Sequence, residues 1–282
     1  MKGESARVLQ PTASFAHGFI LIREGGKTAC VRQAESLAIA EALLNGVGCE
    51  PAGVGGRGTL RRFPCGDSHG IIRVYQRGGM MRRFLRDQYL LRNRALRELE
   101  IHQFVFANAL PTPEPLGACW ERCGVWFRGA IATRELDAVT LLQHLDDSCE
   151  AQDAGSVSDL ELLRSCGEAF RQMHDLGICH ADLHVGNVLI ARTPASSLRP
   201  PASGLCPDVY VIDFDKAFAA NRLSSLQRAR NLFRFRRSLE KHGLPPTLFE
   251  ALCDGYGPTA LPGWMSRVYR IKGRVSDLVA RR

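Results

Sequence analysis

Two short segments in the second half of the chain contain the side chains best suited to chemistry. The first, ICHADLHVGNVLI (residues 178–190), contains His180, Asp182 and Asn187 in a short loop before an apolar run. The second, VYVIDFDKA, ends an apolar stretch with Asp213. A carboxylate can accept the proton of an attacking hydroxyl, and carboxylate and amide oxygens are ligands that Mg²⁺ prefers. The pattern predicts phosphoryl transfer, with Asp182 as the base and with Asn187 and Asp213 as magnesium ligands.

His180 lies in the same loop, and we place it with Asp182 among the catalytic residues. We expect it to support the loop by hydrogen bonding rather than to touch the substrate. The alternative interpretation is that these residues are ordinary turn formers, because Asp and Asn favour turns. The second segment argues against this alternative, since Asp213 follows at the end of an apolar strand and supplies a second oxygen ligand.

The elements that must position these residues divide the sequence into a β-rich part and a helical part. The first part is predicted to be mostly strands, with a helical piece at residues 36–46 and one clear helix at residues 88–107. The fold class is therefore α+β, with an N-terminal lobe at residues 1–135 and a C-terminal helical lobe at residues 136–282. In the second lobe the predicted helices lie at residues 140–147, 159–177 and from 224 onward, and the predicted short strands at 187–191 and 209–213.

The composition is that of an ordinary globular protein with a basic surface. Hydrophobic residues make up 45% and charged residues 23%, and the formal net charge is +8, which suits an acidic partner. No stretch is long and apolar enough to span a bilayer, and the N-terminus lacks the apolar core of a secretory signal, so we expect a cytoplasmic protein. The ten cysteines have irregular spacing, which favours reduced, mostly buried thiols over a zinc site.

These segments resemble the signatures of the protein-kinase-like superfamily. HADLHVGN is similar to the kinase catalytic loop, and IDFD stands where kinases have Asp-Phe-Gly, with Asp215 in place of the glycine. With RVYQRGG and RARNLFRFRRSLEKHG, the sequence resembles the bacterial lipopolysaccharide core kinases over residues 50–256, most of all those that act on 3-deoxy-D-manno-octulosonic acid (Kdo). The resemblance implies a bilobal protein-kinase-like fold. No long activation segment follows Asp213, which disfavours a protein substrate.

A kinase also needs a glycine-rich loop over the phosphates of its nucleotide. The stretch GVGGRGTL supplies Gly56 and Gly58 for such a loop, and Arg57 between them adds positive charge. Glycine-rich turns are common, and most of them only reverse the direction of the chain. The resemblance nevertheless implies that these three residues bind the nucleotide.

The same resemblance calls for a cation on the next strand and an acid on a helix to hold it. The strand HGIIRVYQ has Arg73 where a kinase has lysine, and a guanidinium binds phosphate well without being equivalent to lysine. In the helical segment RALRELEIH, we predict that Glu98 pairs with Arg73. Glu100 is the alternative partner, and helical geometry points the two acids about 200° apart.

The implied reaction is the ATP-dependent phosphorylation of a sugar hydroxyl of Kdo in Kdo-lipid A, in lipopolysaccharide inner-core biosynthesis. ATP and Mg²⁺ are the implied cofactors. The implied partners are the anionic glycolipid and the cytoplasmic face of the inner membrane, where the protein would be peripheral; no specific nucleic acid or protein partner is expected. Arg230, Arg234 and Arg237 fall on one face of the predicted helix 224–241 and would face this lipid. A plain solvated helix is the alternative.

Other functions stay open from the sequence. A heptose kinase or an aminoglycoside-type phosphotransferase would use the same chemistry, and the acidic segment 135–175 suits a polycationic acceptor. A non-catalytic pseudokinase scaffold is favoured by Arg73 and Asp215. Against the scaffold, all the residues of the predicted phosphoryl-transfer site are intact.

Overall fold

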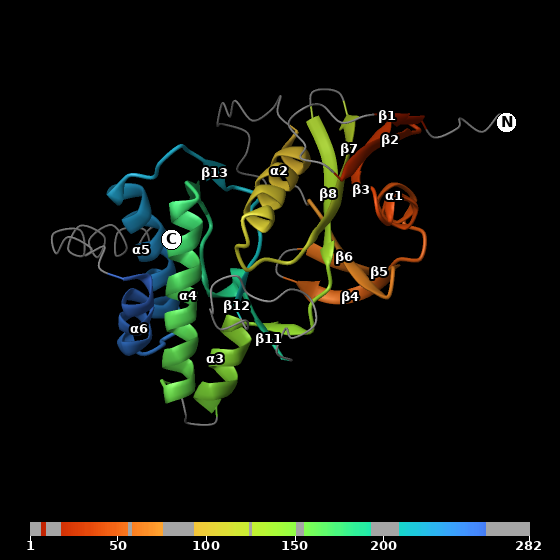
Figure 1. The fold of residues 1–282 in the computed structure, drawn as a ribbon. Coiled ribbons are helices and arrows are strands. Elements are labelled where there is room, and N and C mark those ends of the chain that lie inside the picture. Colours follow the sequence, from red (N-terminus) through yellow and green to blue (C-terminus); the bar gives the residue numbers. More distant parts are fainter. Residues whose placement is uncertain are drawn as a thin grey trace, which may run out of the picture. The chain divides into compact units, whose positions relative to one another are not determined.

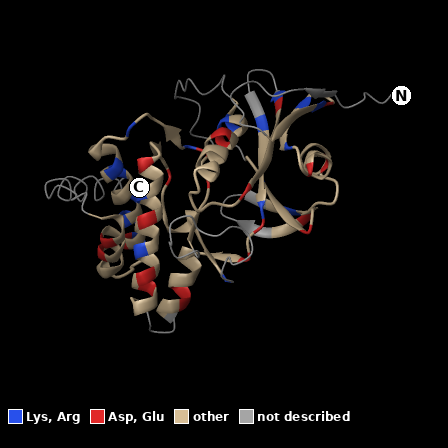
Figure 2. Cartoon of the chain, in the orientation of Figure 1, with Lys and Arg blue, Asp and Glu red and all other residues tan. Residues whose placement is uncertain are grey.

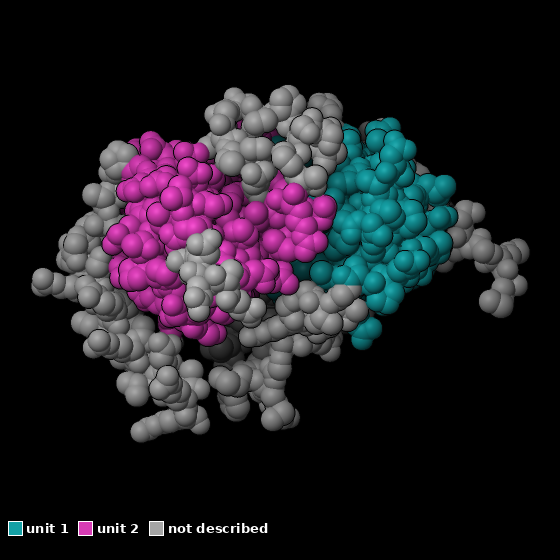
Figure 3. Space-filling model, turned by 90° about the horizontal axis from the view of Figure 1, so that it is seen from below, with its two compact units in different colours: residues 1–106, 113–136 teal, residues 107–112, 137–282 magenta. Residues whose placement is uncertain are grey.

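The computed structural model describes residues 7–9, 18–55, 58–75, 93–123, 126–150, 155–192 and 209–257. The chain divides into two compact units, which have different colours in Figure 3. The first unit comprises residues 1–106 and 113–136, and the second comprises residues 107–112 and 137–282.

Residues 107–112 belong to the second unit, although they precede the predicted lobe boundary between residues 135 and 136. The Thr112 hydroxyl donates a hydrogen bond to the Val211 carbonyl at 2.8 Å, and the Val211 amide donates one to the Pro111 carbonyl at 2.9 Å. The predicted extended run of prolines thus pairs with a strand that lies 99 residues further along the chain. Local sequence patterns do not indicate such a distant pairing.

Among the residues described, the first unit contains an eight-stranded antiparallel sheet in the order β1-β2-β3-β7-β8-β6-β5-β4 (Figure 1). This arrangement confirms the predicted β-rich character of the first lobe. The glycine segment predicted between strands joins β4 to β5, and its residues 56 and 57 lie outside the described residues. The strands are β1 Arg7–Leu9, β2 Phe19–Glu24, β3 Lys27–Arg32, β4 Glu50–Gly55, β5 Gly58–Cys65, β6 Ser68–Val74, β7 Pro115–Cys123 and β8 Trp126–Arg134.

Opposite faces of this sheet are covered by two helices, α1 Ser36–Asn45 and α2 Arg94–Ala107 (Figure 1). On strand β3, Ala29 and Val31 belong to the apolar cluster that contains α1. Cys30, which lies between them, belongs to the cluster that contains Leu99 of α2. Because successive side chains of a strand point to opposite faces, each helix covers its own face of the sheet.

The sequence predicts both helices, and the structure confirms them over the described range. Helix α1 ends at the predicted glycine: Gly46 has a φ of 71°, and its amide donates a hydrogen bond to the Ala42 carbonyl at 3.0 Å. Helix α2 begins at Arg94, after Asn93, whose side-chain oxygen accepts a hydrogen bond from the Leu96 amide at 3.1 Å. Residues 88–92 of the predicted helix lie outside the described residues.

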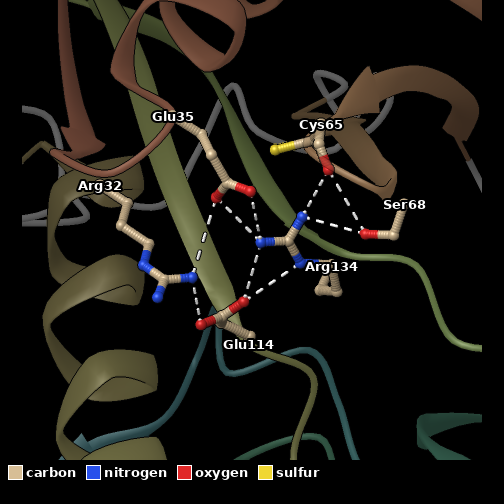
Figure 4. A network of polar contacts seen from close by, with 6 residues as sticks. All are labelled: Arg32, Glu35, Cys65, Ser68, Glu114 and Arg134. Atoms are coloured by element: carbon tan, nitrogen blue, oxygen red, sulfur yellow. Dashed lines mark hydrogen bonds and ion pairs between the residues drawn. The ribbon is translucent and has the colours of Figure 1, made fainter. Parts of the chain in front are cut away.

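A cluster of ion pairs joins several elements of the first unit at the end of β8 (Figure 4). The Arg134 guanidinium donates to Glu35 at 2.9 Å and to Glu114 at 3.1 Å, and it also donates to the Cys65 carbonyl at 2.9 Å. Arg32 pairs with the same two carboxylates. The Arg134 side chain is only 11% exposed, so these charges attract each other more strongly than a pair on the open surface. The cluster ties the start of α1 to strands β5, β7 and β8.

The second unit is mainly helical in its described part, as predicted. Its helices are α3 Leu141–Glu150, α4 Val157–Asp175, α5 Ser225–Lys241 and α6 Pro246–Tyr256. Its two small sheets have the orders β12-β11-β9 and β10-β13, with β9 Ala138–Thr140, β10 Ile178–Cys179, β11 Val188–Ala191, β12 Val209–Val211 and β13 Phe218–Ala219. Helix α5 begins soon after Asp213, which agrees with the predicted lack of a long activation segment.

Helices α4 and α6 pack closely because each has a glycine at the contact. A Cβ on Gly167 would lie 2.1 Å from the Leu252 carbonyl oxygen, and a Cβ on Gly255 would lie 2.0 Å from the Arg164 carbonyl oxygen. A glycine inside a helix costs about 1 kcal/mol relative to alanine. Here only glycine lets the two backbones meet, and α4 leads from this contact directly into the loop that contains Asp182.

Candidate active site

His180 supports the loop from a buried position directly after β10. Its side chain is almost fully buried, and its Nε2 contacts the Ile212 carbonyl at 2.9 Å. The Asp182 amide donates to its Nδ1 at 3.3 Å, so the neutral ring has its hydrogen on Nε2, which donates to Ile212. Burial lowers the pKa of His180, against the opposing effects of the Ile212 hydrogen bond and the nearby carboxylates. This geometry supports a positioning role and not a contact with substrate.

Asn187 and Asp213 are brought together by the pairing of β11 with β12. Val188 lies opposite Val211 in this antiparallel ladder, and the Ile212 amide donates to the Asn187 carbonyl at 3.0 Å. Asn187 is therefore hydrogen-bonded to Ile212, the residue directly before Asp213. Its side-chain Nδ2 donates to the Asp182 carbonyl at 2.9 Å, which leaves its Oδ1 as the amide atom suited to a cation.

Asp213 has a left-handed backbone conformation, with a φ of 67°. A residue other than glycine is uncommon in this region, and Asp and Asn tolerate it better than most. Strained backbone of this kind persists where the surrounding structure fixes it, and it concentrates at functional sites. Here the conformation turns the chain immediately after β12 and sets the position of the Asp213 carboxylate.

The carboxylates of Asp182 and Asp213 act electrostatically on the same two imidazole rings. Burial lowers the pKa of both His180 and His184, and both carboxylates act in the opposite direction on each ring. Hydrogen bonds bring the segments of the two acids together: His180 contacts the Ile212 carbonyl next to Asp213, and Asn187 bonds both to Asp182 and to Ile212. The backbones that carry Asp182, Asn187 and Asp213 are therefore neighbours in the second unit.

The donor set of Asn187 and Asp213 suits magnesium. Both side chains offer hard oxygen atoms, and Mg²⁺ is commonly held by one or two protein oxygens, with water and substrate phosphates completing its shell. Within the described ranges no cluster of three or more His, Cys, Asp or Glu side chains can hold a metal ion by itself, so an ion here would depend on such additional ligands. When bound, magnesium would neutralise charge on the phosphates.

In the first unit the predicted pair of Arg73 and Glu98 is present. The Arg73 guanidinium donates to Glu98 Oε1 at 2.5 Å, and the Glu98 side chain is 2% exposed. Glu100 instead lies near Cys30, where burial and this acid together raise the pKa of the thiol to about 12. Whether Arg73 binds phosphate stays a prediction.

Tyr75 is a member of this cluster that the sequence did not indicate. Its hydroxyl donates to the second oxygen of the Glu98 carboxylate, so both oxygens of that acid are occupied. The guanidinium carbons of Arg73 and Arg94 lie 5.3 and 5.2 Å from the centre of its ring. Gly58 begins β5, whereas Gly56 and Arg57 lie outside the described residues.

Asn231, on helix α5, fixes the backbone of His180. Its Oδ1 accepts from the His180 amide at 3.0 Å, and its Nδ2 donates to the His180 carbonyl at 2.9 Å. On the same helix, the Ser238 hydroxyl accepts from the Val185 amide at 3.3 Å. The only sign of this role in the sequence is an Asn among the apolar positions of the helix, and this sign does not identify its partner.

A buried histidine supports Asn231 in turn. His174 Nε2 donates to Asn231 Oδ1 at 3.2 Å, and the Tyr256 hydroxyl donates to His174 Nδ1 at 2.9 Å. Burial lowers the pKa of His174 to about 4, so its ring is neutral at physiological pH. Helices α4, α5 and α6 therefore hold the loop through one chain of hydrogen bonds.

The fold is protein-kinase-like. The structure described as WaaP in complex with acyl carrier protein has a similar fold, with a TM-score of 0.53 over 82% of this chain and 90% of that chain at 16% identity. The sequence profile of the lipopolysaccharide kinase (Kdo/WaaP) family matches residues 52–256, and the chain belongs to this family. The predicted fold class and family are thus confirmed, and the chain is a kinase that transfers phosphate to a carbohydrate.

Two relatives carry the name 3-deoxy-D-manno-octulosonic acid kinase. The protein of Xanthomonas campestris pv. campestris (strain B100) is 34% identical over 197 residues, which cover 68% of this chain and 70% of that protein. The protein of Xylella fastidiosa (strain M23) is 30% identical over 217 residues, which cover 73% of this chain and 78% of that protein. Each match spans more than two thirds of both proteins.

Replacing Asn231 tests whether α5 positions the loop. Asn231→Ala leaves the buried His180 amide and carbonyl without their side-chain partner, so we expect a loss of about 2 kcal/mol in the free energy of unfolding. We also expect kcat per folded molecule to fall at least tenfold, because the backbone that carries Asp182 loses its support. Urea unfolding and a phosphate-transfer assay measure the two effects.

The matched control for this test is Asn221→Ala, which removes the same side chain from an exposed position in the same unit. It should change neither quantity appreciably. A stable Asn231→Ala protein with wild-type kcat would show that the two hydrogen bonds from Asn231 to the His180 backbone do not position Asp182.

Proposed function

We propose that this enzyme uses ATP and Mg²⁺ to phosphorylate a sugar hydroxyl of Kdo in Kdo-lipid A, in lipopolysaccharide inner-core biosynthesis. The observation that supports the chemistry most strongly is that hydrogen bonds hold the segments of Asp182, Asn187 and Asp213 next to one another in the second unit. The choice of acceptor is supported by the family and by the names of the relatives.

Asp182 is the proposed general base. Its side chain is 46% exposed, so an acceptor hydroxyl can reach it, while its backbone is held by His180 and Asn187. As the sugar oxygen attacks the γ-phosphorus of ATP, the hydroxyl proton passes to Asp182. The new oxygen–phosphorus bond forms, the bond to the departing ADP oxygen breaks, and the phosphorylated sugar leaves. A fixed backbone beneath an accessible carboxylate suits this positioning role.

We also propose that Arg73, together with Gly56, Arg57 and Gly58, binds the phosphates of the nucleotide. The support comes from Glu98 and Tyr75, which hold the guanidinium of Arg73 in one place. A guanidinium that is already oriented loses less freedom when it binds phosphate.

The acceptor assay tests the proposed reaction. We expect the wild-type protein to add phosphate from ATP to Kdo-lipid A, and Asp182→Asn to lower kcat by about 100-fold or more, because the base is lost. Mass spectrometry of the glycolipid measures the product. Asp147→Asn, at an exposed position of α3, is the control and should leave kcat unchanged.

The same assay includes a heptose-containing core and an aminoglycoside as acceptors. If the protein phosphorylates only the heptose-containing core or only the aminoglycoside, the proposed acceptor is wrong but the phosphoryl-transfer reaction still stands. An Asp182→Asn protein with the wild-type rate would contradict the role of the base.

We further propose that the protein acts at the cytoplasmic face of the bacterial inner membrane as a peripheral protein. No helix within the described ranges has the length and apolarity to cross a bilayer. Helix α5 instead has a row of exposed cations at intervals of four, three and four residues, which places them on one face. Figure 2 shows basic residues along this helix. The row consists of Arg230, Arg234, Arg237 and Lys241.

The helix that carries this row also contacts the catalytic loop within the second unit. Arg230 and Arg234 act electrostatically on Cys179, the residue before His180, and oppose the increase in its pKa that burial causes. Asn231 and Ser238, which follow row residues in sequence, contact the loop directly. The helix that carries the row is therefore the one that supports the catalytic loop.

Vesicle binding tests the row. The double substitution of Arg230 and Arg234 by Gln should weaken binding to vesicles that contain anionic lipid by roughly 30-fold, since each basic residue near such a surface contributes about 1 kcal/mol. Co-sedimentation measures the binding, and neutral vesicles should bind neither protein. Substituting Gln for Arg164 and Arg192, two exposed arginines of the same unit, makes the same charge change and should weaken binding much less. Equal losses in both double variants would contradict the proposed surface.

A further inference from the structure

Lys216 lies in a short turn three residues after Asp213. Its Nζ is 3.3 Å from Asp182 Oδ2, the carboxylate of the proposed base. The Ala217 amide donates to the Phe214 carbonyl at 2.9 Å and closes the turn. Phe214 and Ala217 are both buried, so the backbone on each side of Lys216 is fixed. The turn thereby directs a cation to the residue that must take the proton.

The ion pair between Lys216 and Asp182 contributes little to stability. The two side chains are 61% and 46% exposed, and pairs at such positions contribute about 0–1 kcal/mol. The pair of Arg192 and Asp137 is similar, with 64% and 66% exposure at 3.8 Å, but it lies outside the catalytic loop. Lys216 differs from Arg192 because it lies at the catalytic loop. Its charge acts on His184, and the charges of Asp182 and Asp213 act on the same ring.

We propose that Lys216 is a further catalytic residue, which binds the phosphoryl group during its transfer while its ammonium stays close to Asp182. The inference rests on the proposed function. An ammonium group has three N–H donors, so contact with Asp182 leaves two for phosphoryl oxygens. Without this cation, the carboxylate and the negatively charged phosphoryl group would repel each other as the acceptor oxygen approaches.

The chemical balance of the step is unchanged by Lys216. The acceptor hydroxyl gives its proton to Asp182, its oxygen bonds to phosphorus, and the bond to ADP breaks. Lys216 keeps its own protons throughout and contributes charge and hydrogen bonds. Such donors, aimed at charge that develops in the transition state, lower the barrier more than they strengthen ground-state binding.

The test compares Lys216→Ala, Lys216→Arg and the control Arg192→Ala, which removes a cation from an exposed ion pair of the same unit. We expect Lys216→Ala to lower kcat by about 100-fold, with the KM for ATP changed by only a few-fold. Lys216→Arg should recover part of the loss because the charge is retained, and Arg192→Ala should have wild-type kinetics. Thermal unfolding should give the same midpoint for all four proteins.

A wild-type kcat for Lys216→Ala would overturn the inference, and so would an effect confined to KM, which would mean binding of the nucleotide in the ground state only. If Asp182→Asn loses activity while Lys216→Ala keeps full activity, Lys216 has no catalytic role and the proposed function still stands. If the wild-type protein does not phosphorylate Kdo-lipid A, the proposed acceptor fails. The Lys216 variants are then compared by the hydrolysis of ATP with water as acceptor, where the same loss supports the role and an unchanged rate overturns it.

Discussion

The hydrogen bond from the buried His180 ring to the Ile212 carbonyl joins the two segments that contain the chemistry. Two carboxylates on separate segments repel each other, so they converge only if the backbones beneath them are held independently of their charges. This support comes from the pairing of β11 with β12 and from the two hydrogen bonds that Asn231 makes with the His180 backbone. The polar groups that hold the loop are themselves buried and bonded, which makes a misplaced loop costly.

In the first unit, charged side chains are likewise held in position by their hydrogen-bond partners. Arg134 brings two glutamates together at the end of β8, and Glu98 holds Arg73 with the help of Tyr75. Arg134 bonds to several acceptors, whereas Arg73 bonds to Glu98 and lies against the ring of Tyr75, so neighbouring side chains orient both guanidinium groups. The sheet thus presents Arg73 from a rigid support, as the loop in the second unit presents Asp182.

Much of the fold and part of the site follow from the sequence, because apolar periodicity and local signals are readable there. Gly46 ends α1 as predicted, and two of the predicted short strands are present, with Asn187 directly before β11 and Asp213 shortly after β12. Asn231 is different, since it bonds to a residue 51 positions away and its side chain has no local signature. The partners of Arg134 also cannot be predicted from local sequence, because they lie up to 99 positions away and are brought together only by tertiary packing.

The proposed reaction depends on Asn187 and Asp213 holding a divalent metal together for phosphoryl transfer. Electron paramagnetic resonance of Mn²⁺, in the presence of a non-hydrolysable ATP analogue, tests it directly. Asp213→Asn removes the charge but keeps a residue that tolerates the left-handed backbone. We expect this variant to bind Mn²⁺ at least tenfold more weakly than the wild type, while Asp147→Asn binds it normally. Unchanged Mn²⁺ binding by Asp213→Asn would contradict the claim.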